Sequence, residues 1–393
     1  MKKAKYIVLK SSRAATRDVF AGVRGLPGAR DLDPPGLSLE VDEIERSRLP
    51  ALSNRADVVA VAPAMPMKLI KPREGNAAPA AAQIAWGVKA VGADNSPFTG
   101  DGIVVSVLDT GIDASHPAFS GAQIIEQDFT GEGNGDQNGH GTHCAGTIFG
   151  RNVNGTRIGV APGVKKALIG KVLGNEGGSS DQICNAMLWA VENGAHVISM
   201  SLGIDFPGFV KLLQDNGFPP ELAATRALEA YRANTQLFER LAALIRARGV
   251  FSQPALVVAA AGNESRRDEN PDWEIAVSPP AVDEGIISIA ALGEGAQGLT
   301  VAPFSNTGAN VSGPGVDVVS AKLGGGLRAL SGTSMATPHV AGVAALWAEK
   351  LKAAGSLNHF NLTARLLGST ISSSLQAGFD PFDVGAGLIQ APQ

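Results

Sequence analysis

The chain has 393 residues, of which 44% are hydrophobic, and its formal net charge is −4. This length and composition predict a globular protein with room for one large and one small domain, and they exclude a disordered chain. The weak negative charge gives no general attraction to nucleic acid or to an anionic membrane, and no apolar stretch in the sequence reaches membrane-spanning length. We therefore expect no nucleic-acid or membrane partner.

The N-terminus and the cysteines bear on the cellular compartment. Lys2, Lys3 and Lys5 precede only a short apolar run, YIVL, whereas a secretory signal needs a longer apolar core. Cys144 and Cys184 allow at most one disulfide bond and make no disulfide framework. These features favour a cytoplasmic location, with export by a signal outside this sequence as the alternative.

Residues 1–75 are predicted to form a small α+β unit with a linker, separate from a large domain over 76–393. The linker covers 71–83 and reads KPREGNAAPAAAQ, which is rich in Pro, Ala and Gly and has no periodicity. Such a segment is exposed and easily cut. The small unit is expected to be a sheet with helices on one face, with strands at 5–10, 37–44 and 57–65 and helices at 12–23 and 45–53.

From residue 84 onward, short apolar runs alternate with helical patterns. This alternation predicts an α/β domain with a doubly wound, mostly parallel sheet and helices on both faces. Asp109, Ser201 and Asn263 fall at the carboxyl ends of predicted strands, where such sheets bind ligands. The predicted strands are 102–109, 166–174, 196–203, 255–263 and 284–292, and the predicted helices are 141–150, 181–194 and 334–354.

The interval between Ser201 and Asn263 is largely helix-forming. Leu237, Leu241 and Leu244 recur at three- and four-residue steps, so one helix face is expected to be buried. We interpret the segment 204–252 as a helical layer on the core, and a dedicated partner-binding device is the alternative.

Three motifs carry side chains suited to nucleophilic chemistry. In VVSVLDTGID, Asp109 ends a buried strand, where a carboxylate needs a partner. In NGHGTHCAG, flanking glycines leave His140 exposed at a helix start, while His143 is expected to be a packed helix residue. In SGTSMATPHVAG, Ser334 lies at a helix start near Pro338, where free N–H groups and the helix dipole favour an oxyanion.

A fourth motif, VVAAAGNES, places Asn263 after a buried strand, where its amide can donate a hydrogen bond to an oxyanion. Taken singly, each of these residues has a simpler structural explanation, such as a helix cap or a turn. Their occurrence together in one chain favours chemistry.

The segments VLDTGID, HGTHCAGT, MSLG, AAAGNE and GTSMATPHVAG resemble the signature segments of subtilisin-like serine peptidases. The resemblance covers about residues 84–391. It implies a serine endopeptidase that hydrolyses peptide bonds of proteins through an acyl-enzyme. Asp109, His140 and Ser334 would be the catalytic triad, and Asn263 would bind the oxyanion together with the N–H of Ser334.

The resemblance also implies a cleft in which a peptide substrate pairs with the edges 176–179 and 201–203 as an added strand. Small residues at 260–262 would floor a roomy apolar specificity pocket. The substrate-binding residues expected on this basis are Gly177, Gly178, Ser201, Leu202, Gly203, Ala261 and Gly262.

The first 72 residues are similar to the inhibitory propeptides of the same family. In that case the segment assists folding, its tail fills the cleft, and cleavage falls near 72–83. The expected partners are protein or peptide substrates and the chain's own N-terminal segment as an intramolecular inhibitor, and the expected oligomeric state is a monomer.

No cofactor is expected to be required. Many members bind calcium through an aspartate and an asparagine, but Ala118 and Val153 stand at the corresponding positions here, and Asn152 and Asn154 could replace them only with a shift. We therefore predict no metal ligand, although structural calcium elsewhere stays open.

The same motifs allow four other interpretations. An aspartic peptidase needs two DTG carboxylates that share a proton, and the chain has one such motif. A zinc site from His140, His143 and Cys144 lacks the four-residue histidine spacing of zinc peptidases. A catalytically idle homologue that acts as a binding protein, and a peptide ligase or cyclase of the same fold, are the remaining alternatives.

Overall fold

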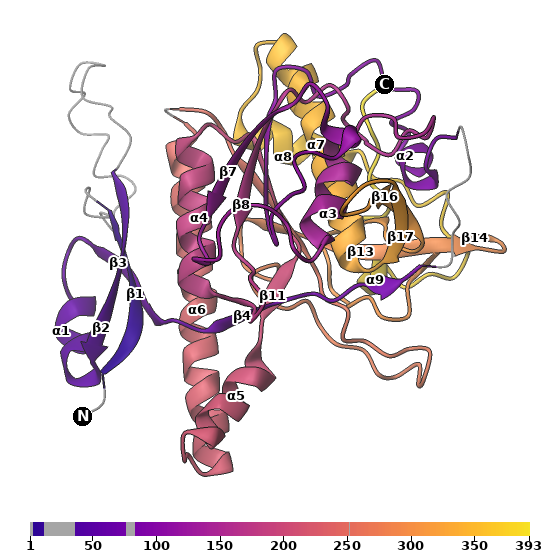
Figure 1. Cartoon of the computed structure of the whole chain (residues 1–393). Coiled ribbons are helices and arrows are strands. Elements are labelled where there is room, and N and C mark those ends of the chain that lie inside the picture. Colours follow the sequence, from indigo (N-terminus) through magenta and orange to yellow (C-terminus); the bar gives the residue numbers. More distant parts are fainter. Residues whose placement is uncertain (1–2, 12–35, 76–82, 251) are drawn as a thin grey trace, which may run out of the picture.

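The computed structural model describes residues 3–11, 36–75, 83–250 and 252–393. A central eight-stranded sheet has helices on both faces, and a small three-stranded sheet lies beside two of those helices (Figure 1). The central strands are β6 (Val104–Asp109), β7 (Gln123–Asp128), β8 (Lys166–Lys171), β10 (Val197–Met200), β12 (Leu256–Ala260), β13 (Ile286–Gly295), β14 (Gly298–Val301) and β15 (Val311–Pro314).

The central sheet is mixed and mostly parallel. Its order is β14-β13-β12-β10-β6-β8-β7, with β15 also paired to β13, and β14 is the antiparallel edge strand. Met200 pairs with Leu108 on one side and with Ala259 on the other. The carboxyl ends of β6, β10 and β12 therefore meet at one edge of the sheet, which brings the residues after these strands together.

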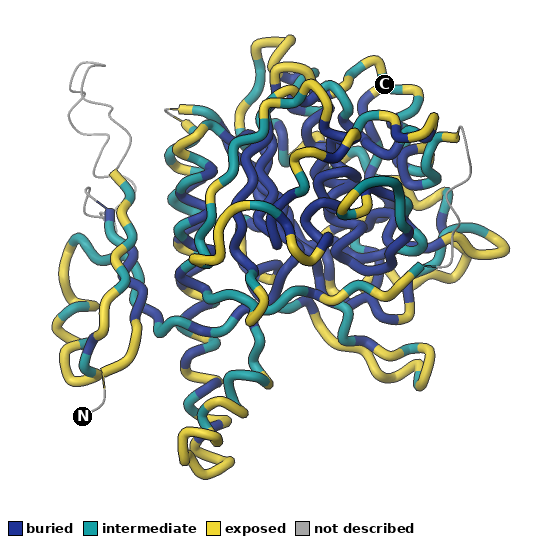
Figure 2. The backbone as a smooth tube through the Cα atoms, in the orientation of Figure 1, coloured by how far each residue is buried: buried dark blue, intermediate teal, exposed yellow. Residues whose placement is uncertain are grey.

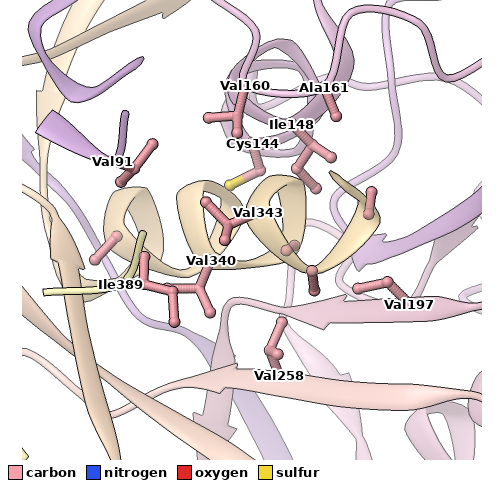
Figure 3. Packing of buried hydrophobic residues seen from close by; sticks show 14 of the residues in the cluster. Val91, Cys144, Ile148, Val160, Ala161, Val197, Val258, Val340, Val343 and Ile389 are labelled. Carbon is pink, nitrogen blue, oxygen red and sulfur yellow. The ribbon is translucent and has the colours of Figure 1, made fainter. Parts of the chain in front are cut away.

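Two hydrophobic cores lie on the two faces of this sheet. The helices α3 (His140–Phe149) and α7 (Thr333–Ala353) pack in one core, and α4 (Ser180–Glu192) and α6 (Pro220–Arg248) pack in the other. In Figure 3, α7 runs between the sheet and α3. The contacting side chains there are Val197 and Val258 from the sheet, Val340 and Val343 from α7, and Cys144 and Ile148 from α3.

The N-terminal sheet consists of β2 (Leu37–Glu45), β1 (Lys3–Ser11) and β3 (Val58–Pro63), all antiparallel, with β1 in the middle. Ile7 and Leu9 face the core formed with α4 and α6, whereas Tyr6 and Val8 face a small cluster with α1. The alternation of side chains along β1 thus lets the sheet cover two neighbours. The strands and the second helix agree with the prediction for 1–72, with the helix divided into η2 (Arg46–Arg48) and α1 (Leu49–Ser53). The helix predicted at 12–23 lies outside the described residues.

The chain that leaves the N-terminal sheet joins two further sheets. β4 (Pro66–Leu69) lies between β11 (Leu202–Ile204) and β9 (Gly178–Ser179), and β5 (Arg73–Glu74) pairs with β17 (Leu327–Ser331), which also pairs with β16 (Val318–Ala321). The structure differs from two predictions in this region. The stretch 71–83 is not linker throughout, because 73–74 form a strand. The run 196–203 is not one strand, because the chain changes sheets at Ser201.

The segment predicted to be helical forms α5 (Phe206–Asp215) and α6. The C-terminal half of α6 buries Leu237, Phe238 and Leu241 in the second core, which agrees with a helical layer on the core. Its N-terminal half extends beyond the body with α5, and the tip is largely exposed (Figure 2). No helix in the described ranges is long and apolar enough to cross a membrane. The remaining helices are α2 (Trp86–Ala90), η3 (Pro117–Phe119), α8 (His359–Gly368) and α9 (Pro381–Val384).

Candidate active site

Asp109 and His140 meet at the carboxyl end of β6, where α3 begins. Oδ1 of Asp109 lies 2.8 Å from Nδ1 of His140, and each side chain is 1% exposed. The prediction that the flanking glycines leave His140 exposed is therefore wrong, because Asp109 and Cys144 lie against its ring. The same carboxylate oxygen accepts a 2.7 Å hydrogen bond from the N–H of Thr110. Oδ2 of Asp109 and Nε2 of His140 have no hydrogen-bond partner within the described part of the chain. Nε2 is therefore available to exchange a proton with another group.

The electrostatics of this pair favour a basic imidazole. Burial by itself lowers the pKa of His140 and is the largest single effect. The charge of Asp109 and its hydrogen bond to the ring, together with the contact with Cys144, outweigh burial and raise this pKa well above its ordinary value of 6.5. His143 behaves in the opposite way: burial, with the charge of His140, lowers its pKa to about 3, and its Nε2 lies 3.0 Å from the carbonyl oxygen of Val318. His143 is thus a packed helix residue, as predicted.

The loop before α3 is held by Asp136, which the sequence analysis missed. Its Oδ1 accepts hydrogen bonds from Oγ1 of Thr110 (2.9 Å) and from the N–H of Gly139 (2.8 Å). Its Oδ2 accepts from the N–H (2.9 Å) and Oγ1 (2.6 Å) of Thr142. These bonds fix the backbone that carries His140. An aspartate in the Gly- and Asn-rich stretch GDQNG is typical of a side chain that binds nearby backbone, and this signal could have identified it.

Ser334 is the second residue of α7 and is completely buried. Its Oγ donates a 3.0 Å hydrogen bond to the carbonyl oxygen of Ile70. Pro338 lies inside the helix and not in its opening turn, so the carbonyl of Ser334 lacks its usual helical donor. That carbonyl accepts instead from Oγ of Ser201 (3.2 Å) and Sγ of Cys144 (3.4 Å).

Cys144 connects the serine to the histidine. Its sulfur lies 3.4 Å from the carbonyl oxygen of Ser334 and 3.8 Å from Nδ1 of His140. Burial raises the pKa of Cys144, so the side chain is a neutral thiol. Ser334 and His140 therefore share a buried neighbour. The hydroxyl of Ser334 donates to Ile70 and not to Nε2 of His140, which has no partner within the described residues. The serine side chain would therefore have to rotate away from Ile70 before its hydroxyl could donate to the histidine.

Asn263 presents its amide to the same place. Its Oδ1 accepts hydrogen bonds from the N–H and Oγ1 of Thr333, both at 2.9 Å, which turns Nδ2 toward the cleft. Nδ2 donates a 3.1 Å hydrogen bond to the carbonyl oxygen of Lys71. A Cβ at Gly332 would lie 2.9 Å from Nδ2, so the glycine leaves room for this amide. Sequence reasoning missed Thr333, although its place beside Ser334 was a signal.

The predicted substrate edges enclose β4. A Cβ at Gly177 would lie 2.8 Å from the carbonyl oxygen of Met67, so glycine there permits close approach. Ile70, the residue after β4, is buried, and a Cβ at Gly203 would lie 3.8 Å from its Cγ1. The paired residues are Met67 with Gly178, Lys68 with Gly203, and Leu69 with Leu202.

Three other predicted substrate residues have structural contacts. Ser201 binds the carbonyl of Ser334 through its hydroxyl. The N–H of Gly262 donates to Oγ1 of Thr333 at 3.2 Å, and the buried Ala261 accepts at its carbonyl from the N–H of Ser278 at 3.1 Å. These contacts position the strand end and the start of α7.

One group of three side chains in the described ranges could share a metal ion, namely Asp109, His140 and Cys144, whose ligand atoms lie within 4.8 Å of one another. Nδ1 of His140 is already bonded to Asp109, and Cys144 is a neutral thiol, so these residues do not fit a metal centre. His143 is not part of the group, which removes the zinc arrangement considered from the sequence.

Comparison with known proteins agrees with this site. Residues 100–385 match the sequence model of the Subtilase family, a range that includes Asp109, His140, Asn263 and Ser334. Subtilisin BL and Subtilisin Savinase from Lederbergia lenta are each 36% identical to this chain over 302 residues, covering 74% of this chain and 94% of theirs. An intracellular serine protease from Paenibacillus polymyxa is 36% identical over 300 residues, covering 74% of this chain and 79% of that protein.

Proposed function

Because this chain belongs to the subtilase family and is a serine endopeptidase, we propose that Asp109, His140 and Ser334 are its catalytic triad, within a chain made as a self-inhibited precursor. The observation that carries the triad is the buried 2.8 Å contact between Asp109 and His140, with Cys144 in contact with the histidine ring and with the backbone carbonyl of Ser334.

In this mechanism the hydroxyl of Ser334 attacks the carbonyl carbon of the peptide bond while Nε2 of His140 takes its proton. Asp109 holds the imidazole in the required tautomer and stabilises the imidazolium. Nδ2 of Asn263 and the N–H of Ser334 bind the oxyanion. His140 then gives the proton to the leaving amine, and water, deprotonated by the same imidazole, releases the acyl group from Ser334.

A peptide substrate would bind where β4 now lies. Backbone hydrogen bonds to β9 and β11 give affinity that is independent of sequence, and the buried position of Ile70 supports the apolar pocket. Subtilases need no cofactor for catalysis. Ala118 and Val153 are buried and apolar, which supports the absence of calcium at that position.

We propose that residues 1–75 inhibit the peptidase over 76–393, which acts as a monomer, until cleavage near 72–83. Three contacts hold the N-terminal sheet on α4 and α6. Nζ of Lys5 lies 2.7 Å from Oδ2 of Asp181 on α4, and the buried Asn234 of α6 donates to the carbonyl of Pro63 at 2.8 Å. Arg46 and Glu229 pair at 2.9 Å.

The chain beyond these contacts blocks the cleft. Ser334 donates to the carbonyl of Ile70, while Asn263 donates to that of the next residue, Lys71. The hydroxyl of Ser334 and the amide of Asn263, the proposed oxyanion donor, thus bind the carbonyls of two successive residues and not the same carbonyl. This offset supports an inhibitory role, because attack needs both groups at one carbonyl.

A fluorophosphonate probe tests the catalytic assignment. We expect it to label the wild-type chain and Ser356→Ala, a matched control on a distant loop, but not Ser334→Ala. The labelled species should be shorter than the full chain, with a new N-terminus near 72–83. Equal labelling of Ser334→Ala would refute the triad, and labelling of a chain with an intact Met1 would refute the precursor proposal.

Peptide digestion separates hydrolysis from the two alternatives. An idle homologue would neither label nor cleave, and a ligase or cyclase would give joined products in place of free carboxylates. We expect free carboxylates, read by mass spectrometry of the products.

A further inference from the structure

Two basic residues of the segment that fills the cleft each face acidic side chains of the peptidase. Lys68 lies two residues before Ile70, and Arg73 lies three residues after it. Nζ of Lys68 is 3.4 Å from Oε1 of Glu264 and 3.8 Å from Oδ1 of Asp205. Its backbone is held at the same time by the pairing of β4 with β11. The lysine therefore occupies a defined position between two carboxylates.

The two carboxylates near Lys68 are held by partners of their own. Asp205 caps α5 by accepting a 3.2 Å hydrogen bond from the N–H of Gly208. Oε2 of Glu264 accepts a 2.9 Å hydrogen bond from Nδ2 of the buried Asn306. Because these bonds do not involve Lys68, both carboxylates are expected to stay in place for any other peptide in the cleft.

A similar arrangement lies on the other side of Ser334. Nη1 of Arg73 is 3.3 Å from Oδ2 of Asp268, and its guanidinium carbon is 5.0 Å from the ring centroid of Phe304. Phe304 is buried, so its ring gives a fixed surface for a cation. The backbone of Arg73 is paired with Ser331 of β17. This position therefore also combines strand pairing with a site for positive charge.

We propose that the cleft selects peptides with basic side chains at two positions five residues apart, one on each side of the reacting serine. This inference rests on the proposed function, because it takes the strand pairing of 66–69 and 73–74, but not the offset carbonyls of Ile70 and Lys71, as that of a substrate. Backbone pairing alone would accept any extended peptide. The carboxylates of Asp205 and Glu264, and Asp268 with Phe304, favour a cation at these two positions over a neutral side chain and disfavour an anion.

The size of the preference follows from the exposure of the groups. The side chains of Lys68, Asp205 and Glu264 are 36%, 31% and 37% exposed, so solvent screens the attraction. We expect kcat/KM to favour lysine over glutamine at this position by about threefold, and lysine over glutamate by about tenfold, at low salt. The preference should shrink at 0.5 M salt.

The test uses the full chain after its activity has become constant, and fluorogenic decapeptides that differ at one position. The first set has Lys, Gln or Glu two residues before the residue whose carbonyl is attacked, which is the position of Lys68 relative to Ile70. The second set has Arg, Gln or Glu three residues after the attacked residue, which is the position of Arg73 relative to Ile70. Mass spectrometry of the products fixes the cleaved bond. The enzymes are wild type, Asp205→Asn with Glu264→Gln, and Asp268→Asn. Asp215→Asn, which removes an exposed carboxylate paired with Lys211 on α5, is the matched control.

We expect the double variant to lose the Lys-over-Glu preference in the first set and to keep the Arg-over-Glu preference in the second. Asp268→Asn should do the reverse, and Asp215→Asn should keep both. Equal kcat/KM for all peptides in a set, from wild-type enzyme that cleaves them all, would overturn this proposal and leave the proposed function intact. Failure to cleave any peptide would overturn the proposed function, and with it the preference.

Discussion

Asp283 is a buried carboxyl group that should make the stability of this protein depend on pH. Its side chain is buried in the turn before β13, and neither carboxylate oxygen has a hydrogen-bond partner in the described part of the chain. Burial, together with the negative charge of Glu239 on α6, raises the pKa of Asp283 from 3.8 to about 8. The folded chain therefore holds a proton on this residue at neutral pH that the unfolded chain releases.

The raised pKa of Asp283 fixes the direction of its contribution to stability. Between pH 4 and pH 8 the folded state binds more protons at this site than the unfolded state, so the free energy of unfolding falls as the pH rises. Each pH unit lowers the free energy of unfolding by up to about 1.4 kcal/mol, so the decrease between pH 5 and pH 8 is about 4 kcal/mol. Asp283→Asn removes the ionisation and with it this slope.

Urea unfolding, followed by tryptophan fluorescence, measures this effect in a Ser334→Ala background that cannot digest itself. The free energy of unfolding of Asp283→Asn, relative to its parent, should rise by about 4 kcal/mol from pH 5 to pH 8. The unpaired amide adds an offset of about 1–3 kcal/mol that does not depend on pH. Asp215→Asn, an exposed control, should show a nearly constant difference. Parallel pH curves for Asp283→Asn and its parent would refute the reasoning.

Three further predictions concern the site and its inhibitor. Asp109→Asn should lower kcat about 10⁴-fold and move the acidic limb of kcat/KM to lower pH, because the charge that raises the pKa of His140 is lost; an unmoved limb in the pH profile would contradict this. Asn263→Ala should lower kcat about 10²–10³-fold with little change in KM, the loss measured for the corresponding donor in subtilisin; steady-state kinetics in which KM carries the loss would argue against an oxyanion role. Arg46→Ala should shorten the lag before activity appears by less than about fivefold, because this pair with Glu229 is exposed. The double variant with Glu229→Ala should shorten it no further, and additive effects would show that the pair is not coupled.

The sequence by itself determined most of the peptidase fold and the identity of the proposed catalytic residues. Strand and helix periods are local properties, so the runs that became β6, β8, β12, α4 and α7 could be recognised from windows of about ten to twenty residues. The catalytic side chains lie inside short motifs at the ends of these elements. Gly141 lies in the motif that carries His140, but the reason for a glycine there is tertiary, since a Cβ would lie 2.1 Å from the carbonyl oxygen of Gly111.

Only the tertiary structure decided which distant segments touch. Nothing local to 66–74 indicates that β4 lies between β9 and β11 or that Lys68 faces Glu264. Likewise, nothing local to 196–203 indicates that the chain passes from the central sheet to another sheet at Ser201. The register of β4 depends on the packing of the N-terminal sheet against α4 and α6 more than a hundred residues away, and on hydrogen bonds that any extended backbone can make. Such contacts leave no periodic signal in one sequence, because they depend on shape and charge that are assembled only when the chain has folded.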